Sequence, residues 1–212
     1  MKLKLTLIAI LFAFASMAYA QGPLSNLSIG VGLQGVFPAA TFDKTSSNEG
    51  SPYPTVQSSS KSVGYTVDGR YNFGRHSALD LSVTWNRNTE YYGNSEGNVY
   101  HVQTNNGEGI VSYIARLPST ERLKPFALVG GGLVRFSPND DYSVNAGSPQ
   151  TTTKAAFAYG FGSDVRISDS WGIRMQYRGL LRSAPDFKIP SIFGTGLKSH
   201  VVEPSIQLLY HF

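Results

Sequence analysis

The sequence predicts an all-β chain that folds as an eight-stranded antiparallel up-and-down transmembrane β-barrel. Three observations predict this class. Eight stretches alternate apolar and polar residues, as a strand does when its two faces meet different surroundings. The connections between these stretches alternate between short and long. The polar faces carry charges in mid-strand, and these charges are arginine and acid, with almost no lysine.

The first twenty residues have the features of a secretory signal. Two lysines precede an apolar run over residues 5–17, and an A-x-A site at Ala18 and Ala20 follows it. This arrangement is typical of a signal peptide, and the run is shorter than the roughly 20 apolar residues of a membrane-spanning helix. We predict cleavage between Ala20 and Gln21.

The remaining residues, 21–212, are expected to form one outer-membrane β-barrel domain. Without the two lysines of the signal, 16 of the 18 basic residues remain against 14 acidic ones, so the mature chain is nearly neutral and gives no reason to expect nucleic acid as a partner. The absence of cysteine excludes disulfides and thiolate metal sites. No later segment is long and apolar enough to cross a membrane as a helix.

Each predicted strand has an apolar residue at every second position over most of its length. In the fifth stretch, Phe126 and Phe136 are expected on the lipid face and Arg135 on the opposite face. These two phenylalanines are ten positions apart, about 25 Å along a tilted strand, which matches an apolar band between two aromatic girdles. In chain order the stretches are Leu27 to Phe37, Val63 to Phe73, Leu79 to Asn86, Glu108 to Leu117, Phe126 to Phe136, Phe157 to Ile167, Trp171 to Arg178 and Val202 to Phe212.

The connections predict which end of the barrel faces the periplasm. Short links at 74–76, 118–123 and 168–170 are expected to be periplasmic turns. Four long segments rich in serine, glycine, proline and asparagine are expected to be extracellular loops. These segments run over 38–61, 93–103, 137–153 and 182–198.

The mid-strand charges are expected to point into the barrel and to pair with one another. Arginine suits this role because its planar fork matches a carboxylate, and an eight-stranded barrel has room inside only for side chains. We therefore predict a side-chain-filled lumen, and a narrow or gated pore remains the alternative. The predicted lumen network is Asp68, Arg70, Asp80, Glu108, Arg116, Arg135, Asp164, Arg166, Arg174, Arg178 and Glu203.

Gly30, Gly32 and Gly35 have the G-x-G-x-x-G spacing of a dinucleotide-binding loop. That motif needs a following helix and an acid about 20 positions on, whereas a proline-rich segment without helical periodicity follows here. We therefore interpret Gly30 and Gly32 as inward positions that leave room for arginines across a narrow lumen.

The C-terminus, "PSIQLLYHF", resembles the assembly signal of bacterial outer-membrane proteins, which ends in an aromatic residue with apolar residues at alternate positions. With "KPFALVGGGL" and "WGIRMQYR", it makes the mature chain resemble the outer-membrane β-barrel domain family, and especially the small eight-stranded barrels of the OmpA/OmpX type. The resemblance implies the outer membrane of a Gram-negative cell, contact with its lipids and lipopolysaccharide, and the barrel assembly machinery as a partner. It implies that this machinery reads Leu208, Tyr210 and Phe212.

Catalytic and metal sites are not evident in the sequence. Lipid A deacylases of similar architecture carry a His-x-Ser-Asn run, whereas "KSHVVEPSIQ" places Val201 and Val202 after His200. His76, His101 and His211 have no metal-ligand or catalytic spacing, and Asp140 and Asp141 are expected in a solvated loop.

We accordingly expect no cofactor, no metal and no enzymatic activity. The favoured function is a structural or surface-interaction role through the extracellular loops, with an extracellular ligand as a further partner. The alternatives are a narrow, porin-like conduit for small molecules and, less favoured, a lipid A-modifying enzyme.

Overall fold

A computed structural model describes residues 24–42, 56–93, 99–118, 120, 122–143, 147–189 and 198–212. The predicted signal peptide and its cleavage site lie outside these residues. Among the described residues, no helix is long and apolar enough to cross a membrane. The long strands are β1 (Leu27–Pro38), β4 (Ser62–Asn72), β5 (Ser77–Gly93), β6 (Val99–Arg116), β7 (Leu123–Tyr142), β8 (Thr152–Arg166), β9 (Trp171–Ser183) and β10 (Lys198–His211), and the short elements are η1 (Leu24–Asn26), β2 (Thr41–Phe42) and β3 (Val56–Ser59).

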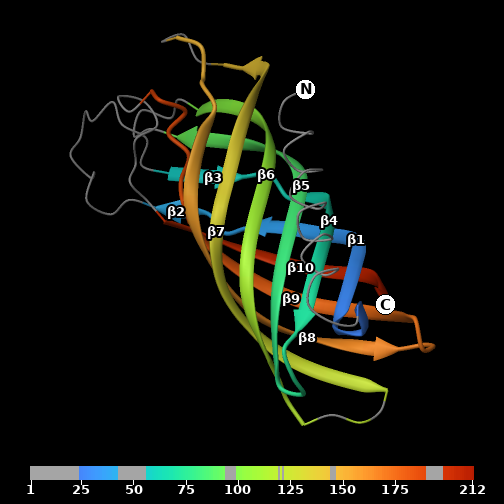
Figure 1. The fold of residues 1–212 in the computed structure, drawn as a ribbon. Coiled ribbons are helices and arrows are strands. Elements are labelled where there is room, and N and C mark those ends of the chain that lie inside the picture. Colours follow the sequence, from blue (N-terminus) through green and yellow to red (C-terminus); the bar gives the residue numbers. More distant parts are fainter. Residues whose placement is uncertain are drawn as a thin grey trace.

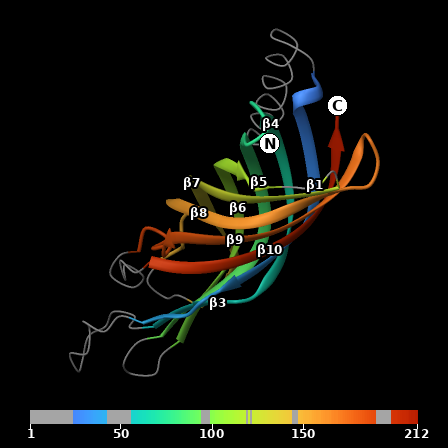
Figure 2. The same ribbon diagram turned by 90° about the horizontal axis from the view of Figure 1, so that it is seen from below.

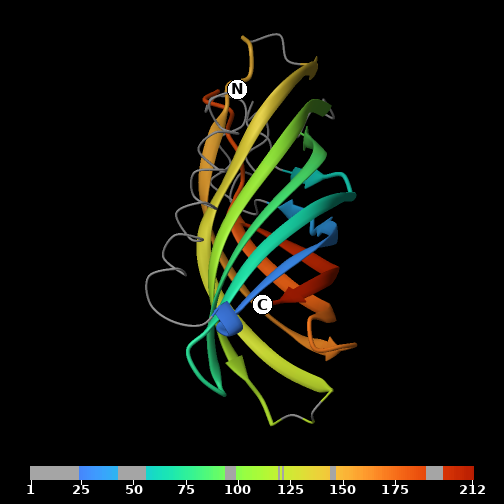
Figure 3. The same ribbon diagram turned by 45° about the vertical axis from the view of Figure 1, so that its right-hand side comes forward.

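The eight long strands form one closed antiparallel barrel (Figure 1). Each pairs with its neighbours along the chain, and β1 pairs with β10 from Ser28 opposite His211 to Pro38 opposite Val201. Figure 3 shows how steeply the strands are tilted, and that the C-terminus lies near the end where β1 begins. The predicted fold class is therefore confirmed.

The apolar side chains face outward and the charged ones inward, the reverse of a soluble barrel. Tyr65 is 71% exposed and Phe161 is 64% exposed, whereas Arg70 and Arg174 are fully buried. Around the whole barrel, large apolar side chains form an exposed band, far more than a soluble monomer presents to water. This band suits a hydrocarbon environment.

The orientation predicted for β7 is wrong. Phe126 and Phe136 point into the barrel and are buried, while Arg135 is exposed on the outer face. The pair therefore does not mark aromatic girdles. The outer face of β7 carries Val129 and Leu133 instead, which are about half exposed.

Aromatic residues of other strands lie on the outer face at the end with the short turns. Tyr71 and Phe73 lie 5.8 Å apart between ring centroids, and Trp171 packs edge-on to Tyr210 at 5.1 Å. Tyr210 in turn contacts Phe212 at 5.0 Å. Together these rings form an aromatic belt. Amphipathic rings of this kind favour the boundary between a membrane and water.

The short turns lie where they were predicted, between β4 and β5, β6 and β7, and β8 and β9. The long connections are shorter than predicted, because β5, β6 and β7 run on past the band as paired strands (Figure 1). Two elements within 38–61, β2 and β3, pair with one another, and β3 pairs with the far end of β5. Asp140 and Asp141 consequently lie in β7 and not in a loop.

Two inward glycines lie where a side chain would meet groups that fill the lumen. A Cβ on Gly30 would lie 2.6 Å from the Asp68 Oδ1 atom and 2.7 Å from the Gln207 Oε1 atom. A Cβ on Gly162 would lie 2.6 Å from the Phe126 ring. The room predicted at Gly30 is thus used by an acid that binds an arginine, whereas Gly32 mainly allows close approach of the β10 backbone at Ile206.

Candidate functional site

Three arginines of β9 organise the lumen. Arg174, Arg178 and Arg182 are four residues apart, so all three fall on the inner face of the strand. Each is at most 3% exposed. A buried charge is tolerated only when it is paired. The partners of these three side chains therefore decide whether the lumen is filled by ion pairs.

The tier nearest the short turns contains Arg174 and Arg70. The Arg174 Nε atom donates to Asp164 Oδ1 at 2.7 Å, and its Nη1 atom donates to Asp68 Oδ2 at 2.6 Å. The Arg70 Nε atom donates to Asp80 Oδ1 at 2.8 Å, and its Nη1 atom to Asp164 Oδ2 at 3.2 Å. Two guanidinium groups and three carboxylates thus form one bonded cluster.

The middle tier is centred on Arg178. Its Nε atom donates to Glu203 Oε2 at 2.6 Å, its Nη2 atom to Glu108 Oε2 at 2.9 Å, and its Nη1 atom to Ser82 Oγ at 3.0 Å. The Asn86 amide donates to the other oxygen of Glu108 at 3.3 Å. All the nitrogen atoms of this guanidinium are therefore engaged.

A third tier, which the sequence patterns did not predict, lies beyond the middle one. Arg182 Nη2 donates to Glu90 Oε1 at 3.5 Å, and both side chains are buried. Glu90 also accepts hydrogen bonds from Ser59 and from Gln57. The signal was present: Glu90 continues the inward even-numbered positions of β5, and Arg182 continues the four-residue spacing of the arginines.

The inward phenylalanines of β7 act as partners for the arginines. The Arg70 Cζ atom lies 4.4 Å from the centroid of the Phe126 ring, and the Arg182 Cζ atom lies 4.6 Å from that of Phe136. A guanidinium over an aromatic face is attracted to its electron density. Each ring therefore packs against the charged side chains of one tier, Phe126 in the first tier and Phe136 in the third.

The structure brings together eight of the eleven residues predicted for the lumen and leaves three outside the buried network. Arg116 is half-buried and donates to Asn72 Oδ1 at 2.6 Å. Arg166 is exposed and pairs with Asp169 of its own turn, and Arg135 is on the outer face. The lumen positions predicted for Arg135 and Arg166 are therefore wrong. The eight that are brought together are Asp68, Arg70, Asp80, Glu108, Asp164, Arg174, Arg178 and Glu203.

The ion pairs cross the full bore of the barrel. Around the ring β1-β4-β5-β6-β7-β8-β9-β10, β9 lies four strands from β5 in either direction, so the Arg182–Glu90 pair joins opposite walls. The Arg70–Asp164 pair joins β4 to β8, which are also opposite. Arg178 links Glu108 on β6 to Glu203 on β10, again opposite strands. Figure 2 shows this ring from below.

A cluster of buried apolar side chains lies at the barrel end opposite the short turns, and Phe187 from the β9–β10 connection is part of it. The Tyr92 hydroxyl donates to the Pro185 carbonyl at 2.8 Å, and the Gln150 N–H donates to the Phe187 carbonyl at 3.0 Å. Phe187 and Lys188 have positive φ angles of 46° and 59°, which bulky residues adopt only when surrounding contacts impose them. Residues 184–189 therefore fold over and into the barrel mouth.

Asp186 fastens this segment in a pH-dependent way. Its carboxylate accepts hydrogen bonds from Lys154 Nζ at 2.7 Å, from the Thr152 hydroxyl and from the Lys188 N–H. Partial burial acts to raise the pKa of Asp186, but these hydrogen bonds and the charge of Lys154 outweigh it, and the pKa is lowered. A lowered pKa means that the contact is stable above the unfolded-state pKa and is lost as the pH falls through the folded-state value.

We expect the mouth segment to stay in place from pH 7 to about pH 4 and to loosen only below that, because the ordinary pKa of aspartate is about 3.9. NMR shifts of the Phe187 ring, followed over this range, measure the effect. Asp186→Asn should show a weaker contact that no longer changes with pH. A transition in the wild type above pH 5 would contradict this assignment.

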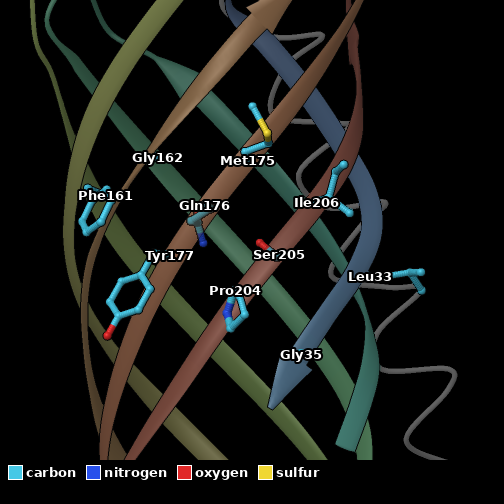
Figure 4. Close-up of a pocket in the computed structure, with 10 residues that line it drawn as sticks. All are labelled: Leu33, Gly35, Phe161, Gly162, Met175, Gln176, Tyr177, Pro204, Ser205 and Ile206. Atoms are coloured by element: carbon cyan, nitrogen blue, oxygen red, sulfur yellow. The ribbon is translucent and has the colours of Figure 1, made fainter. Parts of the chain in front are cut away.

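A hollow of about 510 Å³ lies on the outer face of β8, β9, β10 and β1 (Figure 4). Phe161 and Tyr177 stack along one side with ring centroids 5.3 Å apart. Pro204 and Gly35 also line the hollow, and their small size leaves the surface low there. Its lining residues include no acid, histidine, lysine or arginine. The hollow lies in the lipid-facing band and is lined by no charged side chain.

The histidines are not gathered into a site. His101 faces Asp141 at 3.3 Å on the outer face, and His200 shares a 2.9 Å hydrogen bond with the Tyr159 hydroxyl. Among the described residues, no group of three or more histidines and acids is arranged to hold a metal ion.

Comparison with known proteins decides the family. A family model described as the outer membrane protein beta-barrel domain matches residues 6–200. The chain belongs to this family. Its location is accordingly the cell outer membrane, and the barrel end with the short turns faces the periplasm.

Solved barrels share this architecture at low sequence identity. Neisserial surface protein A is 13% identical, with a TM-score of 0.59 over 89% of this chain and 98% of that one. Pseudomonas aeruginosa OprG is 13% identical, with a TM-score of 0.54 over 88% and 95%. Ail of Yersinia pestis is 15% identical, with a TM-score of 0.50 over 88% and 97%. No curated protein sequence matches the chain.

Proposed function

We propose that the protein is a structural barrel with a lumen closed to ions, which acts through the part of the molecule on the cell surface. The observation that carries this proposal is the set of ion pairs that connect opposite walls at three successive levels, directly in two tiers and through Arg178 in the middle one. Guanidinium groups held across so narrow a bore by buried carboxylates leave no continuous water path. Moving them aside would expose unpaired buried charges.

The length of three strands supports a role at the surface. β7 has 20 residues, β6 has 18 and β5 has 17, whereas about ten suffice to cross the hydrocarbon layer. The excess forms a paired sheet beyond the lipid-facing band, widened by β3. Among the similar structures, Ail is described as an attachment invasion locus protein and was crystallised with a heparin analogue. A rigid raised sheet is well suited to present a contact surface.

In planar bilayers we expect the purified protein to give no steady single-channel steps, because the cross-bore pairs exclude hydrated ions. A known channel protein in the same bilayers serves as the positive control. Expression in a host lacking the protein should change cell attachment but not the uptake of small polar solutes. Steady conductance steps above background would contradict the closed lumen.

A second candidate is a conduit for small apolar molecules. The cluster of buried apolar side chains packed around Phe187 favours it, since an apolar lining suits a greasy solute. Uptake of an apolar dye by cells, without ion conductance, would favour this candidate over the first. A lipid-modifying activity has no comparable support in the described part of the chain.

The assembly machinery remains a proposed partner. Leu208, Tyr210 and Phe212 are exposed on the outer face of the last strand and beyond its end, at 50%, 38% and 47%. This exposure is compatible with their being read by that machinery before the barrel closes.

A further inference from the structure

Two arginines face outward in the extracellular half of the barrel wall. Arg87 on β5 and Arg135 on β7 are both exposed. Within the described ranges, neither has a carboxylate within ion-pair distance. They differ in this from the four buried arginines of the lumen, each of which has at least one acid as a partner. Their charge is therefore available to an anion from outside the chain.

Both arginines lie at the upper edge of the lipid-facing band. Trp85 and Leu133, two positions closer to the periplasm on the same strands, are 37% and 57% exposed. Arg87 is ten residues beyond Ser77, where β5 begins, so it lies about 25 Å up a tilted strand, close to the height of a barrel's apolar band. This level is that of the outer-leaflet headgroups.

The strand between them, β6, brings the two arginines to one surface. Arg87 lies opposite Asn105, and Arg135 lies opposite Gly107, two positions further along β6 on the same face. Arg87 Nε donates to Asn105 Oδ1 at 2.9 Å, and Asn105 donates on to Asn139 at 2.7 Å. These bonds orient the Arg87 guanidinium through one nitrogen and leave its terminal nitrogens for another partner.

Space is open between Arg135 and the apolar band. Trp85 and Arg135 lie on either side of Gly107, and a Cβ on Gly107 or on Gly109 would have no atom within 4 Å. An acyl chain is thus able to lie against β6, beside Trp85 and Leu133, with its headgroup at the level of the arginines. The indole of tryptophan also favours the membrane–water boundary.

We propose that Arg87 and Arg135 bind the phosphate groups of a phosphorylated glycolipid of the outer leaflet. Each guanidinium is able to donate two parallel hydrogen bonds to one phosphate, and such charge-assisted bonds are stronger at the edge of the hydrocarbon than in water. Two arginines on alternate strands suit a headgroup that carries two separated phosphates. This site depends on the outer-membrane location and not on whether the lumen conducts ions. An experiment can therefore contradict this lipid site without contradicting the closed lumen, and the reverse.

The test is binding of a diphosphorylated lipid A to the full-length protein in detergent, measured by native mass spectrometry. From roughly 1 kcal/mol per basic residue at a membrane surface, Arg87→Gln or Arg135→Gln should weaken binding about fivefold, and the double variant about 25-fold. Fully dephosphorylated lipid A should bind the wild type weakly and bind the double variant equally weakly. The temperature-dependent gel mobility of a folded barrel shows that each variant is folded.

The matched control is Arg75→Gln with Arg122→Gln, which removes two exposed arginines at the periplasmic turns. This control should keep wild-type affinity for the diphosphorylated probe. Equal affinity in the Arg87 and Arg135 double variant, or an equal loss in the control, would overturn the site. Displacement of the probe by inorganic phosphate or by heparin at the same concentration would also overturn it, since the arginines would then recognise an anion without its lipid.

Discussion

Replacing Arg174 by methionine is expected to lower the free energy of unfolding by about 3–5 kcal/mol, because it leaves buried carboxylates without their counter-charge. Methionine keeps much of the length of the side chain but none of its donors. Asp68 loses its 2.6 Å partner, and Asp164 loses the closer of its two arginines. Equilibrium unfolding in urea, with the protein in lipid vesicles and tryptophan fluorescence as the signal, measures the change.

Arg166→Met is the control for this experiment. Like Arg174, Arg166 falls on the polar face of its strand in the alternating sequence pattern. Its ion pair with Asp169, however, is exposed at the β8–β9 turn. Exposed pairs contribute little, so the change should stay within about 0.5–1 kcal/mol. If the two variants are equally destabilised, the cross-bore network does not stabilise the barrel in the way described.

Phe126→Ala is expected to cost about 3–5 kcal/mol, the usual loss for removing a buried aromatic ring. The ring is 1% exposed, packs beside Gly162 and lies against Arg70 and Arg174. Its removal leaves a cavity in a rigid, charged interior that cannot collapse around it. If β7 faced the other way, lipid chains would fill the vacated space and the loss would be smaller.

Phe73→Ala provides the comparison at the lipid-facing surface near the periplasmic turns. Phe73 is 56% exposed and touches only Tyr71 among the rings of the belt described above. An aromatic pair of this kind contributes about 0.5–1.5 kcal/mol. Urea unfolding of both variants under identical conditions tests the orientation of β7, and a loss at Phe73 as large as that at Phe126 would contradict it.

Alternation of residue types predicted the strands well but could not orient β7. Both faces of this strand are apolar: Phe126 and Phe136 alternate with Val129 and Leu133, and the glycines between them give no contrast. The larger residues were assigned to lipid, whereas in the structure the large rings lie inside the barrel and pack against the guanidinium groups. Where both faces are greasy, the orientation depends on register with the neighbouring strands, which no single strand encodes.

The lumen network was predictable in kind but not in its pairing. Mid-strand acids and arginines point inward wherever the opposite face is clearly apolar, as at Asp68 and Arg174. Which acid meets which arginine depends on shear and tilt, because the partners are on opposite walls. Arg182 and Glu90 were missed because the strands were ended too early, at the point where serine- and glycine-rich sequence suggested a loop.

The cross-bore ion pairs also constrain how the barrel enters the membrane. Arg174 and Asp68 are 106 residues apart in the chain, and Arg182 and Glu90 are 92 apart. Neither half of the sheet is able to neutralise its own charges, so a half-barrel in hydrocarbon would carry bare ions on its concave side. Insertion, curling and charge neutralisation are therefore expected to occur as a single cooperative event, with partly wound intermediates remaining at the aqueous boundary.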